Sequence, residues 1–405
     1  MRMLKGIVVP ALILANLLPT AAQHSQQWKD CENGSDEKQI EACSAIIQAG
    51  RETKKNLARA YSHRGTAYSH KGDRERASKD YDEAIRLDPK SSFAYVLRGN
   101  QQKDRGNVNE AMSNYNQALK IDPNYADPHI GLGNVYSNKK DSDHAIAEFT
   151  KAIRIDPQYA LAYVNRGNEY YKNKDFDNAI CDYSAAIRLN DQHADAYASR
   201  GNSYSAKGDF DRALPDFNKA IGIQQTAIYY NGRGYAYARK KDYDRAISDY
   251  DQAIRLNPDF IFARKNRAYA YEAKNEYSRA IPDFDHILRL QPTDAEVLNS
   301  RCWARALVEE LNAALIDCNE SLRLKPDVAN TIDSRALIQF KLGEFDKAIA
   351  DYDVALKLNP KLAGALYGRG LAKQKKGDAT ADADIAAAKA IQSDIAEKLE
   401  RYGLK

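Results

Sequence analysis

The sequence predicts an all-α protein, a solenoid of about ten helix-turn-helix units with a cap at each end. Three observations lead to this prediction. An Arg-Gly pair, or a close substitute, recurs every 34 residues with one shorter interval between Gly201 and Gly234, and such a period is typical of stacked repeats. The second half of each period carries apolar residues at helical spacing. A proline closes most periods, at Pro89, Pro123, Pro157, Pro258, Pro292, Pro326 and Pro360.

The first element, residues 1–22, has the pattern of an export signal. Arg2 and Lys5 precede the apolar run GIVVPALILANLLP, and the small residues Thr20 and Ala22 follow it. The run is short for a membrane span, although an uncleaved anchor is the alternative. We therefore expect a periplasmic or secreted protein without stable membrane insertion after signal cleavage.

Residues 23–57 are expected to form a cysteine-containing half-repeat that caps the array. The stretch IEACSAII resembles the second helix of a unit, with Cys43 at the aromatic position. In an oxidising compartment, Cys31 and Cys43 are predicted to form a disulfide; two free thiols are the alternative. The polar residues 23–36 are the one candidate for disorder.

The ten units occupy residues 58–391, and the fourth illustrates their pattern. Its first helix is expected near residues 160–173, KNKDF forms the turn, and a second helix follows. The recurring positions are Tyr163, Arg166, Gly167 and Tyr170 in the first helix and Ala179, Tyr183 and Ala186 in the second. Gly167 is expected to face Ala179, because two small residues allow close approach of the helix axes.

This pattern resembles the tetratricopeptide repeat, which has an aromatic residue, a Leu-Gly pair, a tyrosine, an alanine, an aromatic residue and a proline at these spacings. The resemblance implies a right-handed superhelical solenoid, here in an exported bacterial-type member of the family. It also implies that the first helices line a concave groove. The sequence departs from the pattern in having arginine before the glycine.

The arginines are predicted to form ion pairs. Most second helices carry an aspartate directly before their aromatic residue, so an Arg-Asp pair within a unit or between neighbours is expected. The arginines are therefore not interpreted as a phosphate-binding row. After the repeats, residues 392–405 are expected to form a carboxyl-terminal capping helix, with Ile395, Leu399 and Tyr402 at helical spacing.

Three further cysteines lie within the repeats. Cys302 replaces the small residue of the eighth unit and Cys318 replaces its aromatic residue. This paired substitution is compatible with a disulfide between the two helices, and an unpaired state is equally open. Cys181 is expected to be an unpaired thiol.

Composition and motifs argue against catalysis and nucleic-acid binding. Without Arg2 and Lys5, 58 of the 60 basic residues remain against 56 acidic ones, so the net charge of +2 gives little attraction for nucleic acid. We find no phosphate-binding loop, metalloprotease motif or nucleophile elbow. The sequence therefore predicts no enzyme activity, no cofactor and no metal site. The favoured function is a protein-binding scaffold; the alternative is a helical-repeat reader of RNA.

Two rows of groove residues are predicted to contact the partner. Asparagine amides offer both donors and an acceptor to a peptide backbone, although they could instead meet only water or a neighbouring helix. The asparagines are Asn100, Asn134, Asn168 and Asn202, with Asn165 beside them. Farther along, Tyr235, Tyr269 and Trp303, followed by Leu337 and Leu371, are predicted to offer apolar contacts; packing against the next helix is the alternative.

The family's carboxylate clamp, which grips a terminal carboxyl group, is not predicted. Lys265 and Asn266 approach the motif, but Tyr269 stands where its second asparagine belongs. The sequence leaves the identity of the peptide or protein partner open, and with it the question of self-association.

Overall fold

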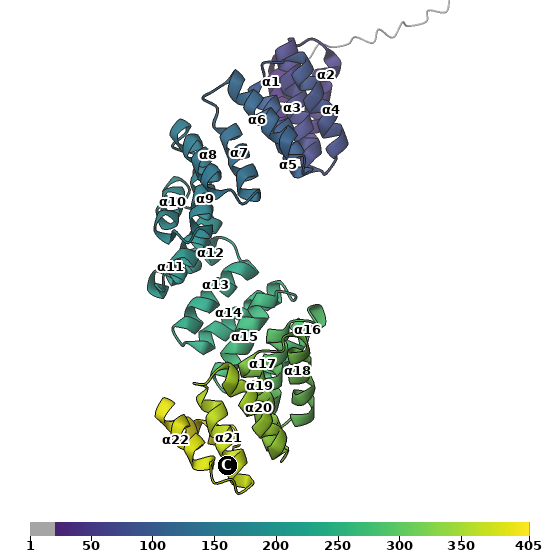
Figure 1. Ribbon diagram of the computed structural model, residues 1–405. Coiled ribbons are helices and arrows are strands. Elements are labelled where there is room, and N and C mark those ends of the chain that lie inside the picture. Colours follow the sequence, from purple (N-terminus) through teal and green to yellow (C-terminus); the bar gives the residue numbers. More distant parts are fainter. Residues whose placement is uncertain (1–20, 405) are drawn as a thin grey trace, which may run out of the picture. The chain divides into compact units, whose positions relative to one another are not determined.

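The computed structural model describes residues 21–404, and every regular element in that range is an α-helix (Figure 1). The all-α prediction is therefore confirmed. The expected export signal lies outside the described residues except for its last two, Ala21 and Ala22, which begin the first helix. Between residues 21 and 404, none of the helices combines the length and apolarity needed to span a membrane.

The described residues form two compact bodies, which are divided in the sequence between Asp191 and Gln192. In the first body the helices are α1 (Ala21–Asn33), α2 (Asp36–Ala49), α3 (Lys54–His70), α4 (Arg74–Leu87), α5 (Ser92–Asp104), α6 (Val108–Ile121), α7 (Ala126–Asn138), α8 (Ser142–Ile155), α9 (Ala160–Lys172) and α10 (Phe176–Leu189). Helices α3 to α10 pair in sequence as repeats 1 to 4, and α1 and α2 precede them.

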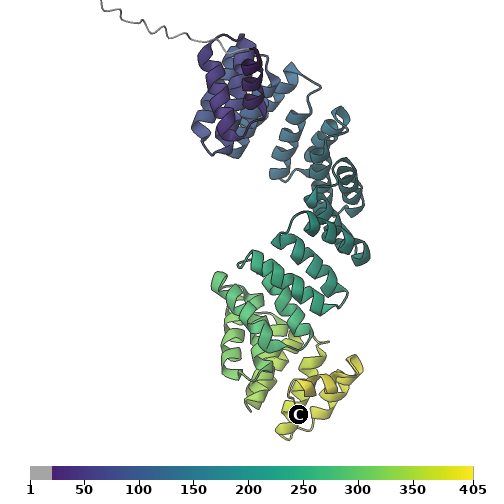
Figure 2. The same ribbon diagram turned by 180° about the vertical axis from the view of Figure 1, so that it is seen from behind.

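The second body holds repeats 5 to 10 and one further helix, and its ribbon runs from teal through green to yellow in Figure 2. Its helices are α11 (Ala194–Ala206), α12 (Phe210–Ile223), α13 (Ala227–Arg239), α14 (Tyr243–Leu256), α15 (Ile261–Ala273), α16 (Tyr277–Leu290), α17 (Ala295–Leu307), α18 (Leu311–Leu324), α19 (Ala329–Lys341), α20 (Phe345–Leu358), α21 (Ala363–Lys375), α22 (Ala381–Ile391) and α23 (Ile395–Arg401). Within each body, first helices of successive repeats contact one another while second helices make no comparable contacts. The first helices therefore lie on the inner side of each stack.

The proposed disorder of residues 23–36 is wrong, because α1 covers most of this stretch. Cys31 is completely buried and is joined by a disulfide to Cys43 in α2, with the Cα atoms 4.8 Å apart. The indole of Trp28 donates a hydrogen bond of 3.3 Å to Glu52 and lies beneath the guanidinium of Arg59. These contacts bury one side of a helix whose other residues are polar, and they explain why a polar stretch is ordered.

The turn between the two helices of a repeat requires a left-handed backbone conformation. Gly72 and Gly208 have φ values of 80° and 79° at this position, while Lys174 adopts 62° in repeat 4. In half of the repeats an aspartate follows and caps the second helix, as Asp175 does by accepting a hydrogen bond from the backbone N–H of Asn178. Each repeat is thereby folded into a tight hairpin.

The first helix has a glycine because the aromatic ring of the second helix, more than the opposing alanine, leaves no space for a side chain. A Cβ atom at Gly167 would lie 2.9 Å from the ring of Tyr183, and one at Gly133 would lie 2.4 Å from Phe149. The expected contact with the alanine is the lesser one in repeat 4, because no atom of Ala179 is among the three nearest. The second-helix aromatic residue thus fills the space that the missing side chain leaves.

The predicted Arg-Asp pairs are confirmed, and they act both within and between repeats. Arg166 donates two hydrogen bonds to Asp182, at 2.8 and 2.7 Å, and a third to Thr150 of the preceding repeat at 3.0 Å. The same bidentate pairing joins Arg64 to Asp80, Arg200 to Asp216, Arg233 to Asp249, Arg267 to Asp283, Arg301 to Asp317 and Arg335 to Asp351. The guanidinium groups of these arginines are therefore occupied by hydrogen bonds that stabilise the repeats.

Repeat 8 replaces the ring-on-glycine contact by a covalent bond. A disulfide joins Cys302 in α17 to Cys318 in α18, with both residues fully buried. Cys181 is a free, exposed thiol in α10.

Candidate functional site

Three of the predicted asparagines lie together on the inner side of the first body. Asn134 of α7 and Asn165 and Asn168 of α9 line a cavity of about 280 Å³, together with Tyr171 and Lys172. All three asparagines are partly exposed. Neighbouring first helices thus supply a row of amides to one open cavity.

The amides of this cavity are partly engaged with one another and with the second helix. Asn165 Nδ2 donates to Asn134 Oδ1 at 3.3 Å, and the hydroxyl of Tyr183 donates to Asn168 Oδ1 at 2.8 Å. Among residues 21–404, no hydrogen bond is found for the amide N–H groups of Asn134 and Asn168 or for Oδ1 of Asn165. The cavity therefore presents both donors and an acceptor at known places.

A buried carboxylate fixes the floor of this site. Glu169 is only 2% exposed and accepts hydrogen bonds from Ser137 at 2.5 Å, Ser142 at 2.9 Å and Lys172 at 2.6 Å. Burial by itself raises the pKa of Glu169, but the hydrogen bonds from Lys172, Ser137 and Ser142 outweigh it and lower the pKa overall. Glu169 is thus held as an anion, and it orients the lysine at the edge of the cavity.

The other two asparagines of the row lie elsewhere. Asn100 is exposed on α5, and its Oδ1 accepts a hydrogen bond of 2.7 Å from Tyr115. Asn202 is partly exposed on α11 in the second body, where the second helix of the repeat carries Phe217 instead of tyrosine. The row predicted from the sequence is therefore brought together only in part.

The predicted aromatic row changes along the second body. Tyr235 is exposed, whereas Tyr269 is partly buried and its hydroxyl donates to Glu296 at 3.2 Å. Trp303 is partly buried with its ring edge-on to Tyr402, while Leu337 and Leu371 are buried. Within this row of five residues, Tyr235 alone presents an open aromatic surface.

Sequence reasoning missed a second amide pair and the residues of the cavity floor. Asn266 Nδ2 donates to Asn231 Oδ1 at 3.0 Å across α15 and α13, which resembles the Asn165–Asn134 contact but has its acceptor four positions earlier in the repeat. Lys265 is paired with Glu296 at 3.0 Å, so it is not placed as a clamp lysine. The shift in register explains the omission, because only residues in strict period were compared.

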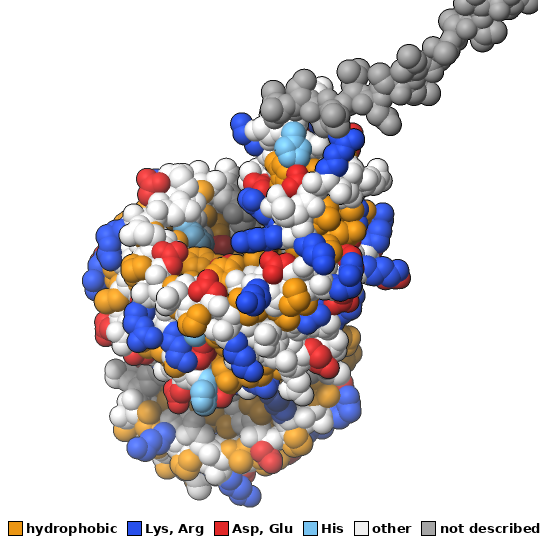
Figure 3. Space-filling view, turned by 90° about the horizontal axis from the view of Figure 1, so that it is seen from above, with side chains coloured by type: hydrophobic (Ala, Val, Ile, Leu, Met, Phe, Trp, Pro, Cys, Tyr) orange, Lys and Arg blue, Asp and Glu red, His pale blue; other side chains and the backbone are white. Residues whose placement is uncertain are grey.

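The described part of the chain offers no metal-binding cluster, since no group of three or more His, Cys, Asp or Glu side chains in it could hold an ion. Acidic and basic side chains are interspersed on the face seen in Figure 3. This mixture agrees with the near-balance of charges in the sequence.

Comparison with family models identifies the repeats. Models described as TPR repeat and tetratricopeptide repeat together match more than half of the chain, at residues 58–91, 99–140, 126–159, 167–208, 194–226, 227–260 and 336–377. A comparison with curated proteins gives no match.

Several solved structures are similar to this chain. The crystal structure of MamA is 27% identical and covers 40% of this chain and 94% of its own, with a TM-score of 0.36. YrrB, a TPR protein with an unusual peptide-binding site, is 25% identical over 50% of this chain and 99% of its own, with a TM-score of 0.36. The APC/C hetero-tetramer Cut9-Hcn1 is 14% identical over 94% of this chain and 96% of the matched chain, with a TM-score of 0.47.

Proposed function

Because the chain belongs to the tetratricopeptide-repeat family, we propose that it is a non-catalytic scaffold that binds an extended segment of a protein partner along its first helices. Solenoids of this kind offer extended concave surfaces for such binding. The asparagine cavity of the first body is the proposed point of contact with the peptide backbone.

The observation that carries this proposal is the convergence of Asn134, Asn165 and Asn168 on one open cavity. A peptide backbone presents one N–H donor and one C=O acceptor per residue. The free amide N–H groups of Asn134 and Asn168 match the acceptor, and Oδ1 of Asn165 matches the donor. Binding through the backbone makes the site tolerant of partner sequence.

The place of action is proposed to be periplasmic or extracellular. Residues 1–22 have the pattern of an export signal, and the two disulfides are of a kind that persists in oxidising compartments. Tyr235, exposed on α13, is a further proposed contact in the second body.

Selection of phage-displayed random peptides on residues 23–405 tests the proposal. The parent chain should enrich peptides, and a variant carrying Asn134→Ala and Asn165→Ala should not retain them. Asn124→Ala, at an exposed asparagine in the loop between α6 and α7, is the matched control and should behave like the parent. Equal retention by all three chains would contradict the proposed site. Tight, salt-sensitive binding of single-stranded RNA instead would favour a nucleic-acid reader.

A further inference from the structure

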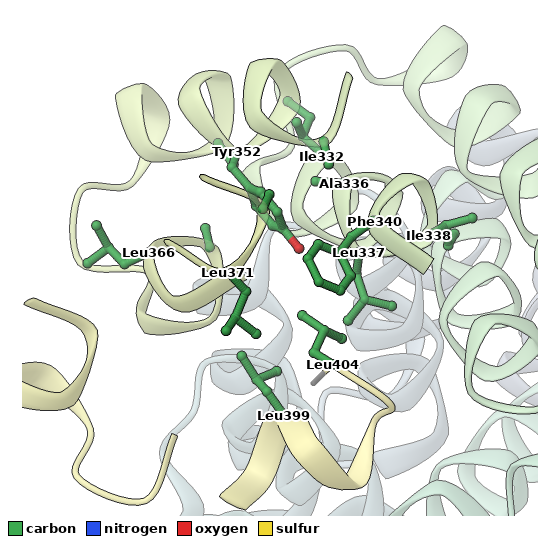
Figure 4. Packing of buried hydrophobic residues seen from close by; sticks show 14 of the residues in the cluster. Ile332, Ala336, Leu337, Ile338, Phe340, Tyr352, Leu366, Leu371, Leu399 and Leu404 are labelled. Atoms are coloured by element: carbon green, nitrogen blue, oxygen red, sulfur yellow. The ribbon is translucent and has the colours of Figure 1, made fainter. Parts of the chain in front are cut away.

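The segment that follows repeat 10 turns back over the first helices of the second body. It consists of α23 and the residues after it, and Ile395, Leu399 and Leu404 are 2%, 5% and 2% exposed. Figure 4 shows Leu399 and Leu404 directed toward Leu371, Phe340 and Leu337 of α21 and α19. We call residues 395–404 the tail segment.

The tail segment reaches upstream to α17 of repeat 8 and to the start of α16 in repeat 7. The ring of Tyr402 lies edge-on to Trp303 of α17, with centroids 5.1 Å apart and planes at 88°. Tyr402 also lies near Tyr277: burial and then this neighbouring phenol raise the pKa of Tyr277. The segment therefore contacts three successive first helices and does not simply extend the stack beyond α22.

The backbone conformation of Gly403 directs the end of the tail segment toward the inner face of the repeats. Gly403 has a φ of 86°, a left-handed turn that brings Tyr402 and Leu404 toward the same surface. A Cβ atom at this position would lie 3.2 Å from Cε and Nζ of Lys341. The side chain of Lys341 is only 6% exposed, and its ammonium is held by Glu309 at 2.8 Å and the carbonyl of Ala306 at 3.0 Å.

The surface under the tail segment is the apolar row of the inner face, with Trp303, Leu337 and Leu371 as its members. The tail segment covers this patch in the structure, and an apolar patch of this kind marks an interaction site in soluble proteins when it is exposed. Here it is filled by an aromatic residue followed two positions later by leucine. The chain thus shows both the surface and the chemistry of a segment that fits it.

We propose that the tail segment is a displaceable internal ligand, and that the surface it covers on α17, α19 and α21 binds a partner segment with an aromatic residue two positions before a leucine. The tail occludes this surface until such a partner competes for it. This inference extends the proposed scaffold function to the second body. Its test needs no natural partner and does not involve the asparagine cavity, so either proposal can fail alone.

Tethering sets the strength of this competition. A tethered segment acts at a high effective concentration, in the millimolar range for short flexible linkers. A free peptide with the same contacts should therefore bind poorly while the tail is seated, and well once the tail's own anchors are removed. Only residues 392–394 separate α22 from α23, so removal of the anchors should free the segment without altering the repeats.

The sequence provides a direct reporter, because Trp28 and Trp303 are its only tryptophans. A chain with Trp28→Phe isolates the fluorescence of Trp303. In this background, Tyr402→Ala with Leu404→Ala should shift Trp303 emission to longer wavelength and increase its quenching by acrylamide. Lys398→Ala with Glu400→Ala changes exposed residues of the tail segment and should leave the emission unchanged.

A synthetic peptide of residues 395–404 is then titrated into both chains. It should bind the Tyr402→Ala, Leu404→Ala chain and restore the emission, and it should bind the intact chain at least about tenfold more weakly because the tethered tail competes. A peptide with serine in place of the tyrosine and both leucines should bind neither. Unchanged Trp303 emission in the tail variant, or equal peptide affinity for both chains, would overturn the proposal. Loss of the helices of repeat 10 in the variant, measured by circular dichroism, would also overturn it, because the tail would then be a structural cap. A dimeric parent that becomes monomeric in the variant would overturn it as well, because the tail would then be exchanged between two copies of the chain.

Discussion

The hydroxyl of Tyr115 donates a hydrogen bond of 2.7 Å to Asn100 Oδ1, which links the second helix of repeat 2 to its first helix. Tyr183 and Asn168 repeat this relationship in repeat 4 at 2.8 Å. Repeats 3 and 5 carry phenylalanine instead of the tyrosine, and their asparagines lack this hydroxyl. The asparagine row therefore combines a structural role with the proposed binding role, and the two can be separated by experiment.

Asn100→Ala should lower the free energy of unfolding by about 1–3 kcal/mol, because the buried hydroxyl of Tyr115 loses its acceptor. Asn202→Ala, the matched change beside Phe217, should stay within about 0.5 kcal/mol of the parent. Urea unfolding followed by circular dichroism measures both. Adding Tyr115→Phe to Asn100→Ala should restore part of the loss; equal losses for the two single variants would remove the structural role.

Removing Arg166 should lower the free energy of unfolding more than neutralising the charge of its partner Asp182. Arg166→Ala leaves Asp182, which is 5% exposed, without its bidentate partner and should cost about 3 kcal/mol or more. Asp182→Asn should cost clearly less, since repeat 2 naturally uses Asn114 to accept from Arg98 at 2.8 Å. Urea unfolding distinguishes the two, and an asparagine variant as unstable as Arg166→Ala would contradict this ranking.

The disulfide of repeat 8 should be replaceable by the packing used in the other repeats. Cys302→Ser with Cys318→Ser should destabilise the chain by about 2–4 kcal/mol. Cys302→Ala with Cys318→Phe copies the buried pair Ala268 and Phe284 of repeat 7 and should recover much of that loss. Thermal melting with and without reductant gives the comparison. If both variants melt alike, ring packing does not substitute for the covalent bond.

Glu272 at the end of α15 should make stability depend on pH near neutrality. Burial raises its pKa from the ordinary value of 4.5 to about 7, so the folded chain holds this proton more tightly than the unfolded chain does. Its stabilising contribution is fully present below pH 4.5 and is lost as the pH rises through 7. Glu272→Gln should flatten this dependence and raise stability at pH 8, as measured by unfolding at several pH values. An unchanged pH profile in the variant would show that the carboxyl group is not responsible.

The repeat architecture could be predicted well because each repeat carries residues of the same kind at the same spacing. Arg166 with Asp182, and the turn before Asp175, follow from residues at fixed spacing, and the structure places them accordingly. The order of α1 could not be predicted from its polar composition, since its stability depends on the buried sides of Cys31 and Trp28. A periodic pattern predicts contacts that recur in every repeat, but it does not predict contacts that occur only at the amino-terminal end of the array.

The candidate site was harder to predict for a related reason. Strict register grouped Asn202 with Asn134 and Asn168, although the chain divides into two bodies after residue 191. It also missed Asn231, which pairs with Asn266 from a different position. The seating of Tyr402 on Trp303 joins residues far apart in sequence, and no repeat pattern encodes such a contact.

Above all, we propose that the amides of Asn134 and Asn165 bind a peptide through its backbone. Isothermal titration calorimetry with a peptide recovered from phage selection tests this most directly when the peptide is compared with a version N-methylated at its central amides. The parent chain should bind the methylated peptide at least about tenfold more weakly, which corresponds to the loss of one or two hydrogen bonds. The Asn134→Ala, Asn165→Ala chain should show the lower affinity for both peptides, with its melting temperature unchanged. Equal affinity of parent and variant for the unmodified peptide would show that these two asparagines do not bind the peptide.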